Sequence, residues 1–145
     1  MKAKMLMIFL FAATAVSAQI RKIPVEVTEA FRIRYPHAEK VEWKDKLSNF
    51  QASFTLNGFK MTAEFSSKGE WERTEREITI EDLPAEVRDG FRKSKYADWP
   101  TGSVAEVDVN DEGLKYRIFV KKSGTNKKYL FFDTTGRLLK ENSTL

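Results

Sequence analysis

Hydrophobic residues recur at helical spacing in two stretches of this chain, and each stretch begins with a proline. The stripe after Pro24 is the fuller one and consists of Val27, Ala30, Phe31 and Tyr35. The stripe after Pro84 repeats it with Val87 and Phe91. Proline suits the first turn of a helix, where its missing N–H costs no hydrogen bond, and Pro36 ends the first stripe because the residue before a proline avoids helical backbone. The spacing predicts one helix after each of the two opening prolines.

After each stripe the alternation changes to period two, which is typical of strands with one buried face. Residues 50–56 and 59–65 alternate strictly, and Asn57-Gly58 between them is a two-residue hairpin turn. Residues 66–69 then turn the chain into a further strand over residues 70–78. In the second half, the residues expected to face the helices are Ala105, Val107, Val109, Tyr116, Ile118, Val120, Leu130, Phe132 and Leu138.

The two halves follow the same order, which indicates a tandem repeat. Ile23-Pro24-Val25-Glu26-Val27 recurs as Leu83-Pro84-Ala85-Glu86-Val87. We therefore expect two copies of a helix followed by a four-stranded antiparallel meander, at residues 19–80 and 81–145, which together form a single compact domain. Runs of strands with segregated helices are typical of the α+β class, with the helices packed on one face of the sheet.

The composition fits a globular protein, because 41% of the 145 residues are hydrophobic and 32% are charged. Residues 1–18 have the features of a removable export signal: Lys2 and Lys4 precede an apolar run over residues 5–16, and Val16-Ser17-Ala18 fits a cleavage site. The apolar run is too short for a bilayer, and Gln19 stands where a lipoprotein needs cysteine. We therefore expect a periplasmic or secreted protein of a Gram-negative bacterium, without stable membrane insertion.

Net charge and the absence of cysteine exclude further classes of function. Removal of the signal would take away two lysines, so that the net charge falls from +4 to 23 − 21 = +2. Such a mixed charge predicts no nucleic-acid binding. The chain has no cysteine, which excludes disulfides, thiolate metal sites and thiol nucleophiles.

Three stretches resemble a known family. They are Phe31-Arg32-Ile33-Arg34-Tyr35-Pro36-His37-Ala38, Val41-Glu42-Trp43, and Phe65 with Gly69-Glu70-Trp71. In these residues the chain is similar to the PepSY-like, β-lactamase-inhibitor-protein-like exported domains, over residues 22–141. The resemblance implies two helix-plus-four-strand repeats that form one continuous curved sheet with the helices on one side. It implies no enzyme activity, and it implies a module that binds or inhibits another protein from the sheet face.

The residues themselves offer no constellation for catalysis. His37, the only histidine, follows a helix-ending proline without a nucleophile-elbow motif, and we expect it in a solvent-facing loop. Residues 108–113 resemble a calcium loop, but Phe119 stands where that loop needs a glutamate, and an acidic hairpin turn is expected instead. The acidic stretch over residues 70–82 is expected on a solvated strand at a sheet edge. We predict no catalytic residue, no metal site and no cofactor.

The second half differs from the first in the residues that point away from the helices. In the first half these positions are all polar: Gln51, Ser53, Thr55, Thr62 and Glu64. In the second half they include the aromatic residues Phe119, Tyr129 and Phe131, which lie in a basic run. The basic residues of this run are Lys115, Arg117, Lys121, Lys122, Lys127 and Lys128. Contiguous exposed aromatic side chains mark interaction sites. We predict a partner-binding surface, an aromatic patch rimmed by basic residues, formed by Arg117, Phe119, Lys121, Tyr129, Phe131 and Leu139.

These observations predict a non-enzymatic exported binding module whose partner is an unknown protein, for example an exported enzyme that it inhibits. As an alternative, the same aromatic side chains would bind a small ligand or a glycan by stacking. It also stays open whether these rings belong to the core or pack in a homodimer. We expect a monomer or a weak homodimer.

Overall fold

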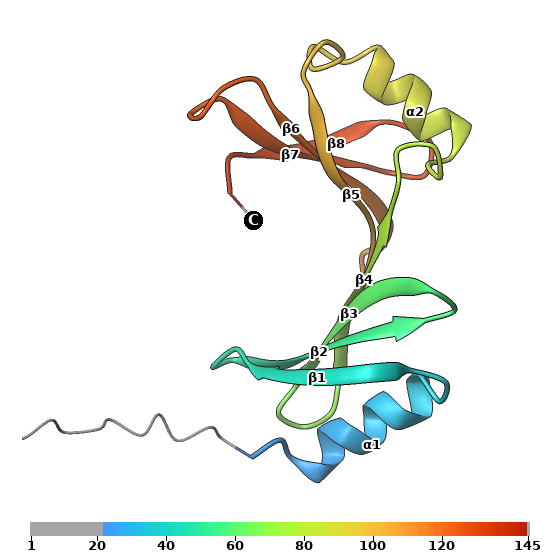
Figure 1. Ribbon diagram of the computed structural model, residues 1–145, viewed down its shortest axis with the longest axis vertical. Helices are drawn as coiled ribbons and strands as arrows, with labels where there is room; N and C mark the ends of the chain where they lie inside the picture. Colours follow the sequence, from blue (N-terminus) through green and yellow to red (C-terminus); the bar gives the residue numbers. More distant parts are fainter. Residues whose placement is uncertain (1–21, 145) are drawn as a thin grey trace, which may run out of the picture.

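Two helices and eight strands make up the described part of the chain (Figure 1). The structure is a computed structural model that describes residues 22–144, so that the expected export signal lies outside the described residues. In chain order the elements are α1 (Val25–Arg34), β1 (Glu39–Asp45), β2 (Asn49–Leu56), β3 (Phe59–Ser66), β4 (Trp71–Ile78), α2 (Ala85–Arg92), β5 (Thr101–Val109), β6 (Gly113–Lys121), β7 (Lys127–Phe132) and β8 (Leu138–Asn142). A helix with four strands is thus followed by a second helix with four strands.

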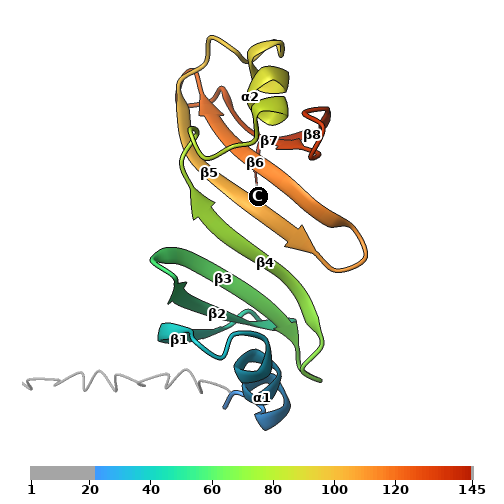
Figure 2. The ribbon, with the colours of Figure 1, turned by 90° about the vertical axis from the view of Figure 1, so that its right-hand side faces the viewer.

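The eight strands form one open antiparallel sheet in chain order, from β1 at one edge to β8 at the other. The fold is therefore mixed α+β, as the pattern predicts. Asn57 and Gly58 form the predicted turn between β2 and β3, and both have the positive φ, 52° and 83°, that a type I′ turn requires. The sheet is strongly curved, and both helices lie on its outer, convex side (Figures 1 and 2).

Each helix packs its apolar stripe on the nearest strands and forms a core there. Under α1, Val27 and Phe31 lie in the core with β2 and β3 residues, and the ring of Phe31 meets that of Phe54 edge to face at 5.0 Å. Under α2, Val87 and Phe91 lie in a second core with residues of β5, β6 and β7. Full burial of one such side chain contributes about 1.5–3 kcal/mol, so that these stripes hold both helices on the same face of the sheet.

Two turn glycines allow close contact between strands and helices. Gly69, between β3 and β4, lies against the backbone of Glu26 in α1, and Gly136, between β7 and β8, lies against the backbone of Glu86 in α2. Both glycines have a positive φ, 81° and 85°, which residues with a Cβ rarely adopt. A Cβ at either position would overlap the backbone oxygen of the facing helix residue. The two halves thus place their turns against their helices in the same way.

The predicted register of one strand is wrong. The pattern places Ala105, Val107 and Val109 toward the helices, but the pairing puts all three on the opposite, helix-free face. Their neighbour Glu106 points to the helix side, where it accepts two hydrogen bonds from the guanidinium of Arg76, at 2.6 and 2.7 Å. The physical reason is the place of β4 and β5 in the middle of the sheet, where the convex surface lies between the two helices and carries polar groups around a hollow.

The acidic stretch over residues 70–82 also lies elsewhere than predicted. Its strand β4 is the fourth of eight, so that it has a neighbour on each side and is no edge. The side chain of Glu75 on β4 is only 16% exposed, because Arg73 and Arg117 both pair with it. This carboxylate therefore belongs to a partly buried ion-pair network and not to a solvated strand.

Candidate functional site

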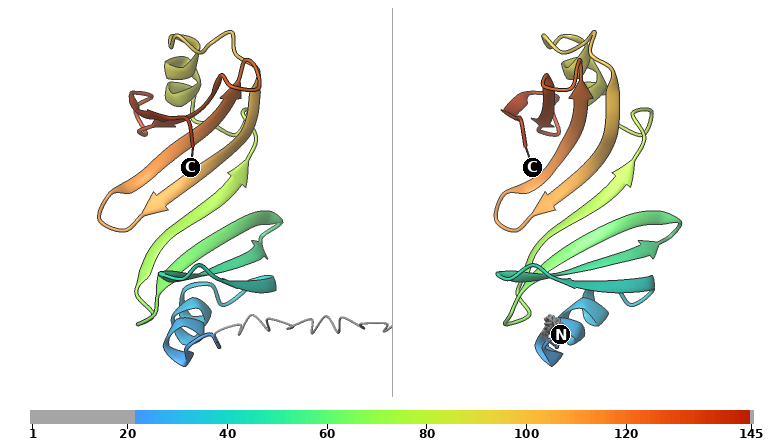
Figure 3. Two further views of the ribbon diagram at one scale, coloured as in Figure 1. Left: turned by 90° about the vertical axis from the view of Figure 1, so that its left-hand side faces the viewer. Right: turned by 60° about the vertical axis from the view of Figure 1, so that its left-hand side comes forward.

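The helix-free face of the sheet is concave, and we call it the open face (Figures 1 and 3). One row of directly paired residues crosses it from β5 to β8 and consists of Ala105, Arg117, Phe131 and Lys140. The adjacent row on β6 and β7 contains Phe119 and Tyr129, which also pair directly. Directly paired residues of an antiparallel sheet share a face. The outward direction predicted for these two rows on β6 and β7 is therefore present in the structure.

Arg117 lies at the buried centre of this surface. Only 8% of the residue is exposed, and its Nη1 donates to Glu75 Oε1 at 2.8 Å. The same oxygen lies 2.7 Å from Nη2 of Arg73, whose Nε is 3.2 Å from Glu64 Oε2. These four side chains form an alternating chain of charges across β3, β4 and β6. Because an unpaired buried charge is costly, this chain is what allows Arg117 to lie inside the surface and not at its rim, where the sequence placed it.

The guanidinium of Arg117 keeps most of its donors without a protein acceptor. It has five N–H donors, and among the described residues Glu75 is its only hydrogen-bond acceptor. The Nε atoms of Arg117 and Arg73 are both buried without a hydrogen bond, since the approach of Arg73 Nε to Glu64 lacks hydrogen-bond geometry. An unpaired buried donor costs about 1–3 kcal/mol, so that an acceptor bound here would stabilise the site.

A groove of about 520 Å³ opens beside Arg117 on the second half of the open face. Its apolar lining consists of Val107, Val109, Phe131 and Leu139. Its charged lining consists of Arg73, Glu112, Lys115, Arg117 and Lys140. Glu112 is already paired with Lys115, and the hydrogen bond from that ammonium lowers the pKa of the Glu112 carboxyl. Since Arg73 and Arg117 are paired with Glu64 and Glu75, the four cations face three carboxylates, and the groove keeps one net positive charge.

The six residues predicted as a partner-binding surface fall into separate groups. Three of them line the groove: Arg117, Phe131 and Leu139. Phe119 and Tyr129 contact each other beside the groove, with ring centroids 4.8 Å apart, and Phe119 packs over Gly102. Lys121 is exposed at the end of β6. All three aromatic rings are half-buried, so that the exposed patch is smaller than the pattern predicts.

A β-bulge brings Leu139 to the groove. It is the extra residue on β8, since its neighbours Leu138 and Lys140 pair with the consecutive Phe132 and Phe131. The β3–β4 pair has a bulge at the same place of its register. At the bulge Leu139 is 42% exposed, which leaves its side chain open to a bound molecule.

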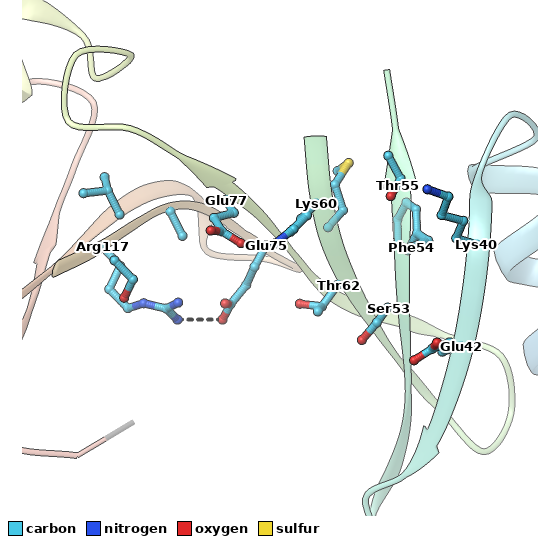
Figure 4. A pocket seen from close by; sticks show the side chains of 14 residues that line it. Lys40, Glu42, Ser53, Phe54, Thr55, Lys60, Thr62, Glu75, Glu77 and Arg117 are labelled. Carbon is cyan, nitrogen blue, oxygen red and sulfur yellow. Dashed lines mark hydrogen bonds and ion pairs between the residues drawn. The ribbon is translucent and has the colours of Figure 1, made fainter. Parts of the chain in front are cut away.

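The first half of the open face is polar and bonded within itself. Glu64 takes the place there that Phe131 takes in the second half, because the two bulged strand pairs share their register. Its carboxylate accepts hydrogen bonds from Gln51 at 3.3 Å and Asn49 at 3.4 Å. A second hollow of about 520 Å³ lies on this half, and Arg117 lines both hollows. Figure 4 shows the lining of the second hollow, with hydroxyl groups and charges of both signs.

Several residues of the groove, and the carboxylate that supports it, were missed in the sequence. Val107 and Val109 were assigned to the core, and Arg73 and its partner Glu75 to a solvated strand. A signal was present in β4, where Arg73, Glu75 and Glu77 recur at period two, so that a cation and two carboxylates share one face. Opposite charges at such spacing favour a network of ion pairs with neighbouring strands over an exposed edge.

Other expectations concern chemistry away from the groove. Within residues 22–144, no group of three or more His, Cys, Asp or Glu side chains is placed to hold a metal ion. His37 is exposed, as predicted, and residues 110–112 connect β5 to β6 as the predicted acidic hairpin turn. Over the same described range, no helix has the length and apolar character needed to cross a membrane.

Taken together, the fold is a two-helix, eight-stranded open-sheet module with one covered and one open face. A family model described as "Putative beta-lactamase-inhibitor-like, PepSY-like" matches residues 48–140. The chain belongs to this family, which confirms the resemblance seen in the sequence. No curated protein matches the chain.

Solved structures with the same fold come from Bacteroides. A DUF2874 family protein from Bacteroides ovatus is 27% identical with a TM-score of 0.80, covering 86% of this chain and 92% of that one. A BLIP-like protein from Bacteroides fragilis is 26% identical with a TM-score of 0.79, covering 84% and 87%. A protein from Bacteroides eggerthii, described as "putative periplasmic", is 25% identical with a TM-score of 0.77, covering 84% and 89%.

Proposed function

We propose that this chain is a non-enzymatic exported module that binds another protein through the second half of its open face. The observation that carries the proposal is the groove beside Arg117, where a buried guanidinium with unused donors adjoins apolar side chains on a face that no helix covers. Buried arginine next to aromatic rings is the composition of interface hot spots. The partner would be an envelope or secreted protein, for example an enzyme that the module inhibits.

The comparisons support a binding role. The matching family is described as β-lactamase-inhibitor-like, and the relative from Bacteroides fragilis as BLIP-like. An inhibitor protein acts by occupying the surface of another protein, which requires a free face of the kind described here. Export is supported by the description of the Bacteroides eggerthii relative as periplasmic and by the signal-like residues 1–18.

The proposal includes a tandem origin for residues 19–80 and 81–145 as two copies within a single compact domain. Two features support it: the shared register of the bulged β3–β4 and β7–β8 pairs, and the matching contacts of Gly69 with Glu26 and of Gly136 with Glu86. One copy then keeps a self-bonded open face, and the other is free to bind.

The glycan alternative would use the ring pair of Phe119 and Tyr129. Sugars stack on exposed ring faces, whereas these two rings are half-buried and tilted by 40° against each other. The geometry therefore favours a protein partner, which contacts a larger part of the open face than one ring pair.

The test is capture of partners from envelope and culture fractions by immobilised residues 19–145. Phe131→Ser removes a ring from the open face, and Ile33→Ser is the matched control, because Ile33 is a 74% exposed hydrophobic residue on α1. Circular dichroism first establishes that both variants are folded. We expect a protein that wild type and Ile33→Ser retain and Phe131→Ser loses.

Two results would contradict the proposal. Retention of the same protein by all three chains would place the binding surface elsewhere. Retention of no protein by the folded wild-type chain from either fraction would contradict the binding role itself.

A further inference from the structure

The groove beside Arg117 also indicates which chemistry its partner presents. We propose that it recognises a protein segment in which an acidic side chain lies next to an aromatic or aliphatic one. This inference rests on the proposed function and deepens it, since it names the class of residue that the open face would bind.

The charge of the groove favours a carboxylate. Its lining contains four cations, Arg73, Lys115, Arg117 and Lys140, against one acidic residue. That acidic residue, Glu112, is already paired with Lys115. Arg73 and Arg117 are also paired with Glu64 and Glu75 beside the groove, so that the four cations face three carboxylates and one net positive charge remains, which is that of Lys140. Complementary charge both speeds association and excludes basic partners.

The guanidinium of Arg117 gives this preference a geometry. A planar guanidinium can bind a carboxylate through two parallel hydrogen bonds, which are roughly twice as strong as bonds between neutral groups. Arg117 uses only Nη1 toward Glu75. Its burial among Val107, Phe131 and other apolar side chains lowers the local dielectric constant, which strengthens a charge-assisted hydrogen bond.

The apolar part of the lining adds the second requirement. Val107 is 3% exposed and forms the floor, whereas Leu139 on the bulge is 42% exposed. Phe131 lies between Arg117 and Lys140 in the same row. An aromatic or aliphatic side chain that follows the acidic residue would cover Leu139 and the ring of Phe131 while the carboxylate faces the cations.

The first half of the chain contains an internal example of this recognition. At the place of Phe131 it carries Glu64, whose carboxylate accepts from Gln51 on one side and lies 3.2 Å from Arg73 on the other. In the second half, the flanking positions are the cations Arg117 and Lys140, and the central acid is replaced by a ring. An acid that the first half supplies itself would therefore come from the partner in the second half.

The test is a titration of isotope-labelled residues 19–145, which contain every described residue, followed by ¹H–¹⁵N and methyl NMR. The probe is the acetylated, amidated pentapeptide Gly-Asp-Phe-Asp-Gly, and its matched control is Gly-Asn-Phe-Asn-Gly. We expect saturable shifts of the Arg117 Nε–H signal and of the Val107 and Leu139 methyl signals. The Kd should be about 1 mM, which corresponds to a binding free energy of about −4 kcal/mol. The Asn peptide should bind at least about fivefold more weakly, as expected for loss of a charged partner.

Charge reversal at one exposed lysine of each half tests which half of the open face binds the peptide. Lys140→Glu reverses a charge of the groove and should weaken the Asp peptide about fivefold, whereas Lys60→Glu, on the first half, should leave its Kd unchanged. Both side chains are at the surface, so that neither variant depends on rebuilding a buried site. Raising the salt concentration should weaken the Asp peptide more than the Asn peptide.

Equal affinity for the two peptides, shifts confined to the first half, or no shift up to about 10 mM peptide would overturn the inference. These results are distinguishable from a failure of the proposed function. A partner that is captured by wild type and lost by Phe131→Ser would keep the binding role, even when the acidic peptide shows no binding.

Discussion

The two halves of the open face have the same register but opposite chemistry. Around Glu64 in the first half, amide and arginine side chains satisfy the central carboxylate. Around Phe131 in the second half, cations flank a ring, and Arg117 has donors to spare. The first half forms the same strands with polar residues on its open face. The fold therefore does not require the ring and the unused arginine donors that the second half carries there. The second half, with its unpaired arginine donors, is therefore the better candidate for binding.

The largest effect is expected where both halves depend on the same contact. Gly136→Ala should lower the free energy of unfolding by about 3 kcal/mol, because positive φ costs about 1–2 kcal/mol and overlap with the Glu86 backbone adds about 1–3 kcal/mol. Gly69→Ala should cost less, because its overlap with Glu26 is shallower. Gly58→Ala, with nothing near its Cβ, is the control at about 1 kcal/mol. Urea denaturation measures all three, and equal costs would refute the steric explanation.

A smaller effect is expected from the ion pair that ties the halves together. Glu75→Gln removes the charge that both Arg73 and Arg117 face, and should lower the free energy of unfolding by about 1–2 kcal/mol. Glu77→Gln, on the same strand but exposed, should change it by less than about 0.5 kcal/mol. Thermal denaturation of both variants at neutral pH measures the difference. If the two variants were equally stable, the network around Arg117 would contribute nothing to folding.

The chemistry of the first half can be transferred to the second. Phe131→Glu places an acid between Arg117 and Lys140, where Glu64 lies in the other half. We expect at least a tenfold weaker affinity for the captured partner, which corresponds to about 1.4 kcal/mol. We also expect a folded protein, because the new carboxylate gains two cationic neighbours. Titration calorimetry with the partner checks the affinity, and unchanged binding would separate the partner site from the groove.

The smallest effect is expected at low pH, in the stability of the turn between β7 and β8. Asp133 begins the β7–β8 turn, and hydrogen bonds, first from the Thr135 hydroxyl, lower its pKa. A carboxyl with a lowered pKa stabilises the folded state above its unfolded pKa, and that contribution is lost as the pH falls through the folded value. Ser66 begins the β3–β4 turn and does not titrate. Below about pH 4, protection against hydrogen exchange, relative to the intrinsic rate at each pH, should therefore fall at residues 133–137 before residues 66–70.

Much of this fold can be predicted from alternation and turn residues alone. Strands β2 and β3 alternate cleanly, and Asn57-Gly58 fixes the β2–β3 hairpin. The outward direction of Phe119, Tyr129 and Phe131 follows when the second half is aligned with the first. Strand β5 could not be predicted in the same way. Its residues Ala105, Val107 and Val109 face the concave side, since the middle of the convex side lies between the helices.

The site was predicted only in part, because its centre depends on contacts that no local pattern contains. Arg117 can be buried because it pairs with Glu75, which lies 42 positions earlier in the chain and two strands away. Leu139 reaches the groove through a bulge, which shifts one residue out of the alternation. Phe131 followed from the alignment of the two halves, whereas Val107, Arg73 and Lys140 join the site only through the curvature and register of the whole sheet.

Site-specific photo-crosslinking in the native cells tests the central claim most directly. A photoreactive phenylalanine analogue would replace Leu139 in the groove, Thr62 in the first half of the open face, or Ile33 on α1. We expect one discrete crosslinked protein from position 139, and none from position 33. Crosslinking of the same protein from position 33 but not from position 139 would contradict the claim that the second half of the open face is the binding surface.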